Sequence, residues 1–86
     1  MSAYKIIIVG AVHKQLKRIN REDKKRILDK IQSLANNPRP HGFKELKGSE
    51  NLFRVRTGDY RIIYEIQDKM LLITILKVGN RREIYR

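Results

Sequence analysis

Three closely spaced arginines, Arg54, Arg56 and Arg61, are the side chains best suited to chemistry in this sequence. The Gly58-Asp59 pair between them is typical of a two-residue turn, which predicts a hairpin that pairs Arg56 with Arg61. Paired residues share one face of a sheet, as do residues two apart in one strand, so the three guanidinium groups project from one side. Two like charges directly opposite each other cost up to roughly 1 kcal/mol. A phosphate held between them would remove this cost, because the guanidinium fork matches phosphate oxygens.

A second basic group stands near the C-terminal end of the sequence. Arg81 and Arg82 follow the most apolar run of the chain, and Tyr85 lies just beyond them. If that run forms a strand beside the hairpin, the tail reaches the arginine face, where Tyr85 can stack on a nucleic-acid base. Nearby positive charge also favours the phenolate, which makes this phenol a candidate base. The arginines alone also fit a solvated basic face, and the tail shifts the balance towards ligand binding.

Charge and composition narrow the partners. Lys and Arg number 20 against 9 Asp and Glu, a net charge of +11 over 86 residues. Such an excess indicates a polyanionic partner, nucleic acid first and an acidic protein second. No segment has the length to span a membrane, so we expect no membrane partner. We expect no metal or cofactor, because cysteine is absent and His13 and His41 lack metal-ligand spacing. His13 is interpreted as a surface residue, and His41 as structural or exposed. We also expect a cytoplasmic location.

Hydrophobic periodicity predicts one α+β domain over residues 1–86. The expected order is β-α-α-β-β-β, with a helical hairpin packed on one face of a mostly antiparallel four-stranded sheet. The run 3–9 is expected to be a strand that is buried on both faces or nearly so. The run 70–78 is expected to be the central strand. Asn20 is the expected N-cap of the second helix. The stretch 38–51 is expected to be a loop, or at most a short irregular strand. The other predicted strands are 52–57 and 60–67.

Two runs of the sequence form recognisable motifs: F-R-V-R-T-G-D-Y-R-I-I-Y at 53–64 and K-V-G-N-R-R-E-I-Y at 77–85, with K-E-L-K-G at 44–48 ahead of them. Together they resemble the RelE/ParE toxin superfamily. The resemblance implies a RelE-like fold and a toxin of a type II toxin–antitoxin system. It also implies a ribosome-dependent endoribonuclease that cleaves mRNA in the A site and inhibits translation. The implied partners are the ribosome, mRNA and a cognate antitoxin, the last in a hetero-oligomer.

The resemblance also implies site residues. Tyr85 would act as the base, the three hairpin arginines would clamp the scissile phosphate, and Arg81 would support the leaving group by charge. No general acid is assigned, and Asn80 stands where many relatives have histidine. The implied catalytic set is Arg54, Arg56, Arg61, Arg81 and Tyr85. We also expect Lys77, Arg82 and Arg86 to bind RNA.

Three alternatives stay open. The first is a ParE-like, non-enzymatic inhibitor of DNA gyrase. The second is a basic RNA- or DNA-binding module without catalysis, and the third is an inactive toxin. ParE-like members typically lack the full basic set with its terminal tyrosine, which favours the nuclease.

Overall fold

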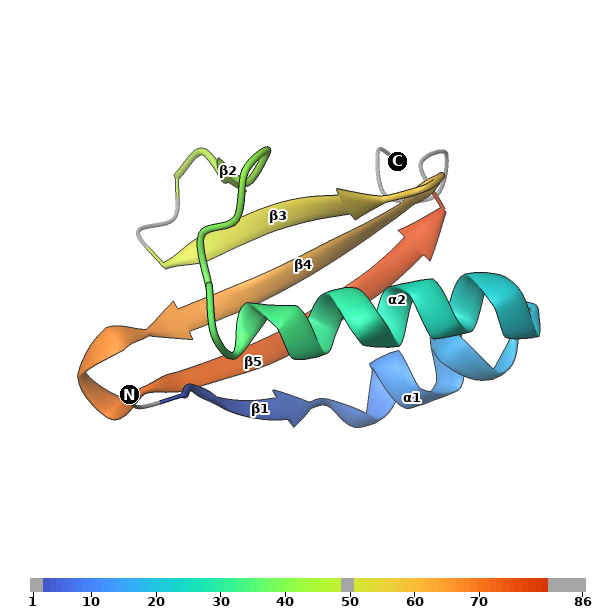
Figure 1. The fold of residues 1–86 in the computed structure, drawn as a ribbon, viewed down its shortest axis with the longest axis horizontal. Helices are drawn as coiled ribbons and strands as arrows, with labels where there is room; N and C mark the ends of the chain where they lie inside the picture. The colour runs from blue at the N-terminus through green and yellow to red at the C-terminus, as the bar shows by residue number, and fades with distance from the viewer. Residues whose placement is uncertain (1–2, 49–50, 81–86) are drawn as a thin grey trace.

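The computed structural model describes residues 3–48 and 51–80. Two helices cover one face of a mixed sheet, as an α+β fold requires (Figure 1). The helices are α1 (Gly10–Lys17) and α2 (Arg21–Leu34), and a 3-10 turn, η1, spans Asp68–Met70. The strands are β1 (Lys5–Ile8), β2 (Lys44–Glu45), β3 (Leu52–Thr57), β4 (Tyr60–Gln67) and β5 (Leu72–Asn80).

The sheet has five strands in the order β1-β5-β4-β3-β2, where four strands were expected. The additional strand, β2, is two residues long and pairs antiparallel with β3, inside the stretch expected to be a loop. β1 runs parallel to β5, because the chain crosses back over the sheet through both helices before it returns. The remaining pairs are antiparallel, so the predicted architecture is confirmed apart from the strand count.

Two expectations about strand position were wrong. β1 is an edge strand with Lys5 and Ile7 exposed, so it is not buried on both faces. The middle strand is β4, whereas the more apolar β5 lies between β4 and β1. Both strands are interior, and both carry apolar runs, so hydrophobicity alone did not separate them.

The core lies between the helices and one face of the sheet. The buried side of α1 carries Val12 and Leu16, and the buried side of α2 carries Ile27, Ile31 and Leu34. Both sets have the predicted helical spacing. The sheet contributes alternate residues of β3, β4 and β5, namely Phe53, Val55, Ile62, Tyr64, Ile66, Ile73, Ile75 and Val78. This alternation sends the intervening side chains of the same strands to the opposite face.

Polar contacts set where the helices begin and how they meet the sheet. Asn20 is the N-cap of α2, as predicted, and its side-chain oxygen accepts from the Asp23 amide at 2.9 Å. β5 continues past the end of β1, which leaves an unpaired strand edge beside α1. Gln15 of α1 covers this edge and accepts a hydrogen bond from the Val78 amide at 2.8 Å. Across residues 3–48 and 51–80, no helix has the length and apolar character needed to cross a membrane.

Candidate nucleic-acid interface

The β3–β4 hairpin has the register that the Gly58-Asp59 turn predicted. Arg56 lies opposite Arg61, and Arg54 lies opposite Ile63. Gly58 has a φ of +59°, in the left-handed region that this tight turn needs. Because Phe53 and Val55 face the helices, the arginines of β3 project from the uncovered face of the sheet.

Pairing across four strands gathers the basic residues into two adjacent rows on the uncovered face. The first row runs from Lys44 on β2 through Arg54 and Ile63 to Lys77 on β5. The second row runs from Arg56 through Arg61 to Gly79. We call these seven residues the basic rows. They hold five cations, so their combined field attracts an anion.

Arg61 projects from the predicted face of the sheet but is buried. It is 1% exposed, whereas Arg56 is exposed and Arg54 is half-buried. Its cross-strand neighbour Gly79 has no side chain to compete for the space. Arg61 makes contacts of its own within the chain, as a buried guanidinium must if its desolvation is to be offset. The exposed cations of the rows are therefore the ones that an incoming phosphate meets first.

A hollow of about 330 Å³ lies at the β2 end of the basic rows, at the lower end of the range for small-ligand sites. Lys44, Arg54 and Arg56 line it, and the loop before β2 adds His41 and Gly42. The sequence predicts that His41 is structural or exposed. It is exposed, but it shares the hollow with two predicted site residues. No pattern along the chain could show this, because the approach depends on β2 pairing with β3.

Four of the predicted site residues, Arg81, Arg82, Tyr85 and Arg86, lie outside the described residues. Lys77 is described, is exposed and belongs to the basic rows. Asn80 pairs with Tyr60, and this register places both on the side of the sheet that the helices cover. Asn80 therefore projects from the face opposite to Arg54 and Arg56.

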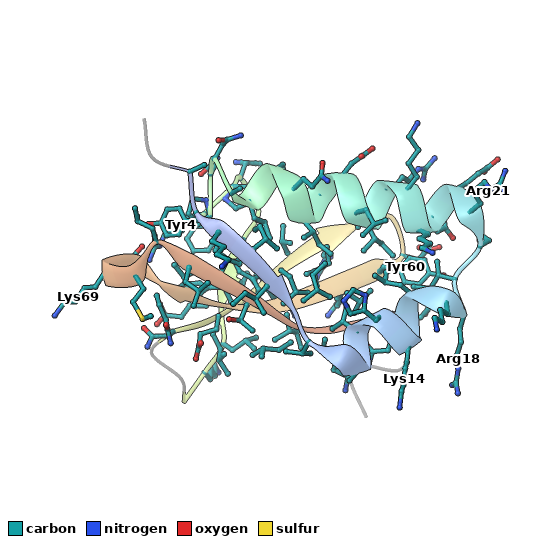
Figure 2. The ribbon with its side chains drawn as sticks, turned by 90° about the horizontal axis from the view of Figure 1, so that it is seen from below. Tyr4, Lys14, Arg18, Arg21, Tyr60 and Lys69 are labelled. Atoms are coloured by element: carbon teal, nitrogen blue, oxygen red, sulfur yellow. The ribbon has the colours of Figure 1, made fainter. Side chains whose placement is uncertain are left out.

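A second basic surface lies on the helices. Figure 2 shows Lys14, Arg18 and Arg21 pointing away from the body of the protein. These residues surround the turn between α1 and α2, on the layer opposite the basic rows. Because these side chains point apart into solvent, we interpret them as a solvated helix surface. Within residues 3–48 and 51–80, no three or more His, Asp or Glu side chains are placed together so that they could bind a metal ion.

Comparisons with known proteins agree with this geometry. The family model described as "ParE toxin of type II toxin-antitoxin system, parDE" matches residues 6–85. The chain belongs to the RelE/ParE toxin superfamily. The putative toxin RelE1 of Methanocaldococcus jannaschii is 31% identical over 86 residues, which cover 96% of each chain. Toxin RelG of Mycobacterium tuberculosis is 42% identical over 43 residues, about half of each chain.

Solved structures of the superfamily share the fold. The archaeal RelE–RelB complex of Pyrococcus horikoshii matches with a TM-score of 0.83 and 32% identity, over 92% of this chain and 96% of that one. The isolated E. coli RelE toxin matches with a TM-score of 0.79 at 21% identity, covering 96% and 92%. The second likeness concerns the fold alone. Together with the family match, these relatives make this RelE/ParE member a RelE-like toxin of a type II toxin–antitoxin system.

Proposed function

We propose that this toxin is a ribosome-dependent endoribonuclease that cleaves mRNA in the A site and so inhibits translation in the cytoplasm. We also propose that residues 1–86 act as one domain. The observation that carries the proposal is the pair of basic rows, which bring five cations together on the sheet face that the helices leave open. Such a face is suited to the phosphates of a single strand of RNA.

The proposed chemistry is attack of a ribose 2′-hydroxyl on the adjacent phosphorus. Arg54 and Arg56 bind the scissile phosphate and stabilise the charge that develops on its oxygens. Arg61, which is buried opposite Arg56, adds positive charge beside them. Tyr85 takes the 2′ proton, and Arg81 stabilises the leaving oxygen by charge, since a guanidinium with a pKa above 12 is a poor proton donor. Lys77, Arg82 and Arg86 bind neighbouring phosphates. These groups are few for an independent nuclease, which fits an enzyme whose substrate the ribosome orients.

We also propose a cognate antitoxin as the neutralising partner, in a hetero-oligomer. The solved relatives from P. horikoshii and M. jannaschii are complexes of RelE with RelB. A chain of net charge +11 gains from a partner that carries compensating negative charge.

The test is cleavage of mRNA on purified ribosomes, mapped by primer extension, with Arg56→Gln as the variant. Arg56 is exposed on the basic rows, so the substitution removes a phosphate ligand without opening the core. We expect about a 100-fold lower rate, the usual effect of losing one group that stabilises transition-state charge. Arg21→Gln is the control, because it removes the same charge from the exposed start of α2. Equal rates for the two variants would contradict the proposal, as would wild-type protein that cuts no A-site codon.

A second candidate function has one observation in its favour, because the matching family model carries the ParE name. It is the non-enzymatic inhibition of DNA gyrase. Expression of the toxin in cells, with translation and replication followed in parallel, separates the two. Protein synthesis stops first if the toxin cuts mRNA, and DNA synthesis stops first if it inhibits gyrase.

A further inference from the structure

His41 occupies the hollow at the β2 end of the basic rows, next to the two arginines that the proposed function assigns to the scissile phosphate. The hollow is lined by His41, Gly42, Lys44, Arg54, Val55 and Arg56. Two of these side chains are guanidinium groups and one is an ammonium group. Arginine and lysine hold their protons far above neutral pH, so neither gives one up readily to a leaving group. An imidazole titrates near neutrality and is the usual proton donor in enzymes.

The loop that carries His41 is anchored on both sides. On its N-terminal side, the Tyr64 hydroxyl donates to the Pro38 carbonyl at 2.7 Å, and Pro40 is buried. On its C-terminal side, the Phe43 ring lies 5.9 Å from the Phe53 ring. The Phe43 amide also donates to the Pro40 carbonyl at 3.0 Å, which closes a turn around His41.

Arg39 adds a further anchor to the same loop. Its guanidinium makes two hydrogen bonds to the Asp68 carboxylate, at 2.8 and 3.2 Å, and lies 5.4 Å from the centre of the Phe53 ring. Gly42 has a φ of +89°, a backbone conformation that L side chains rarely adopt. The bend that brings His41 to the hollow is therefore specified by a glycine and by contacts to β3, β4 and η1. A residue held in this way meets the need of a proton donor for a fixed position.

We propose that His41 is the general acid of the cleavage reaction, an inference that rests on the proposed function. Tyr85 takes the proton from the 2′-hydroxyl, and the 2′ oxygen forms its bond to phosphorus. The bond from phosphorus to the 5′ oxygen breaks, its electron pair goes to that oxygen, and the His41 imidazolium gives it a proton. The products are a 2′,3′-cyclic phosphate and a 5′-hydroxyl. Tyr85 then releases its proton to water and His41 takes one up, which restores both groups. The charged groups beside His41 in the hollow are Lys44 from β2 and Arg54 and Arg56 from β3.

The test compares His41→Gln with His13→Gln, which changes the other histidine, exposed on α1 and remote from the hollow. Each protein cleaves two mRNAs on ribosomes. One is ordinary RNA, and the other carries sulfur in place of the 5′ bridging oxygen at the cleaved bond. A thiolate leaves without protonation, so it needs no general acid. We expect His41→Gln to cut ordinary RNA about 100-fold more slowly or worse, the usual effect of losing a general acid. We expect it to cut the sulfur-substituted RNA within a few-fold of the wild-type rate.

Each other outcome overturns one named statement. An unchanged rate for His41→Gln on ordinary RNA, or a slow rate on both RNAs, removes the proton-donor role while the nuclease proposal stands. Wild-type protein that cuts neither RNA contradicts the nuclease proposal itself. Matching urea midpoints for the wild type and both variants show that folding is unaffected, as expected for exposed side chains.

Discussion

Replacing Tyr64 with phenylalanine tests how the His41 loop is attached to the sheet. The Tyr64 ring is fully buried, and its hydroxyl donates to the Pro38 carbonyl at 2.7 Å. Phenylalanine keeps the ring and removes only this bond. A net hydrogen bond of this kind is worth about 1 kcal/mol. Because Pro38 is half-buried and open to water, we expect the Tyr64→Phe variant to lose about that much stability at neutral pH.

The sign of this difference reverses in alkali. Burial raises the pKa of Tyr64 to about 12 from 10.0, and nearby Arg39 opposes part of the rise. The folded protein therefore holds this proton after the unfolded chain has lost it. The stabilisation is fully present below about pH 10 and is lost as the pH rises to about 12, a change of roughly 2–3 kcal/mol. Phenylalanine has no proton to lose. The variant should therefore be the less stable protein at pH 8 and the more stable one above about pH 11.

The measurement is urea unfolding at several pH values between 8 and 12, followed by far-ultraviolet circular dichroism. The other three tyrosines, Tyr4, Tyr60 and Tyr85, are present in both proteins, so their titration cancels in the comparison. A stability difference that stays constant across this range would refute the argument. It would mean that the Tyr64 hydroxyl ionises equally well in the folded and unfolded chains.

Two further substitutions test the contacts that frame the site. Asn20→Ala removes the cap of α2 and should cost about 0.5–2 kcal/mol in urea unfolding, whereas an unchanged midpoint would show that the bond to Asp23 contributes nothing. Asp68→Asn breaks the bidentate pair with Arg39, whose hydrogen bonds, with that from Tyr4, hold the pKa of the Asp68 carboxyl below its usual value. That carboxylate stabilises the fold above its unfolded pKa, and the effect is lost as pH falls through the lower folded value. The wild type should therefore be more stable than the variant at pH 7, and this difference in stability should disappear below about pH 4.

The hairpin was predictable because its information is local. The Gly58-Asp59 turn sets the pairing, and the alternation of Phe53 and Val55 with the arginines sets the faces, so the register followed without knowledge of the rest of the chain. The helices were predictable for the same reason. Their apolar spacing and the Asn20 cap are signals within one element.

What the sequence did not reveal depends on contacts between distant segments. β2 has two residues and exists only because Lys44 and Glu45 lie beside β3. The bulge in the β4–β5 pairing, near Ile63, and the Gln15 bond to the edge of β5 likewise have no local signal. The burial of Arg61 belongs to the same class, because alternation predicts a face but not what lies over it.

The register that builds the core also presents the basic rows. In β3 and β4 the side-chain period is two, so a slip of one residue would turn Phe53 and Val55 outward and Arg54 and Arg56 into the core. Burying those charges without partners would cost several kcal/mol each. The apolar residues therefore specify the position of the arginines as firmly as they specify the packing on α2. In a fold whose helices cover one face only, that constraint leaves the opposite face to carry the charge, and three residues of that face, Lys44, Arg54 and Arg56, line the hollow with His41.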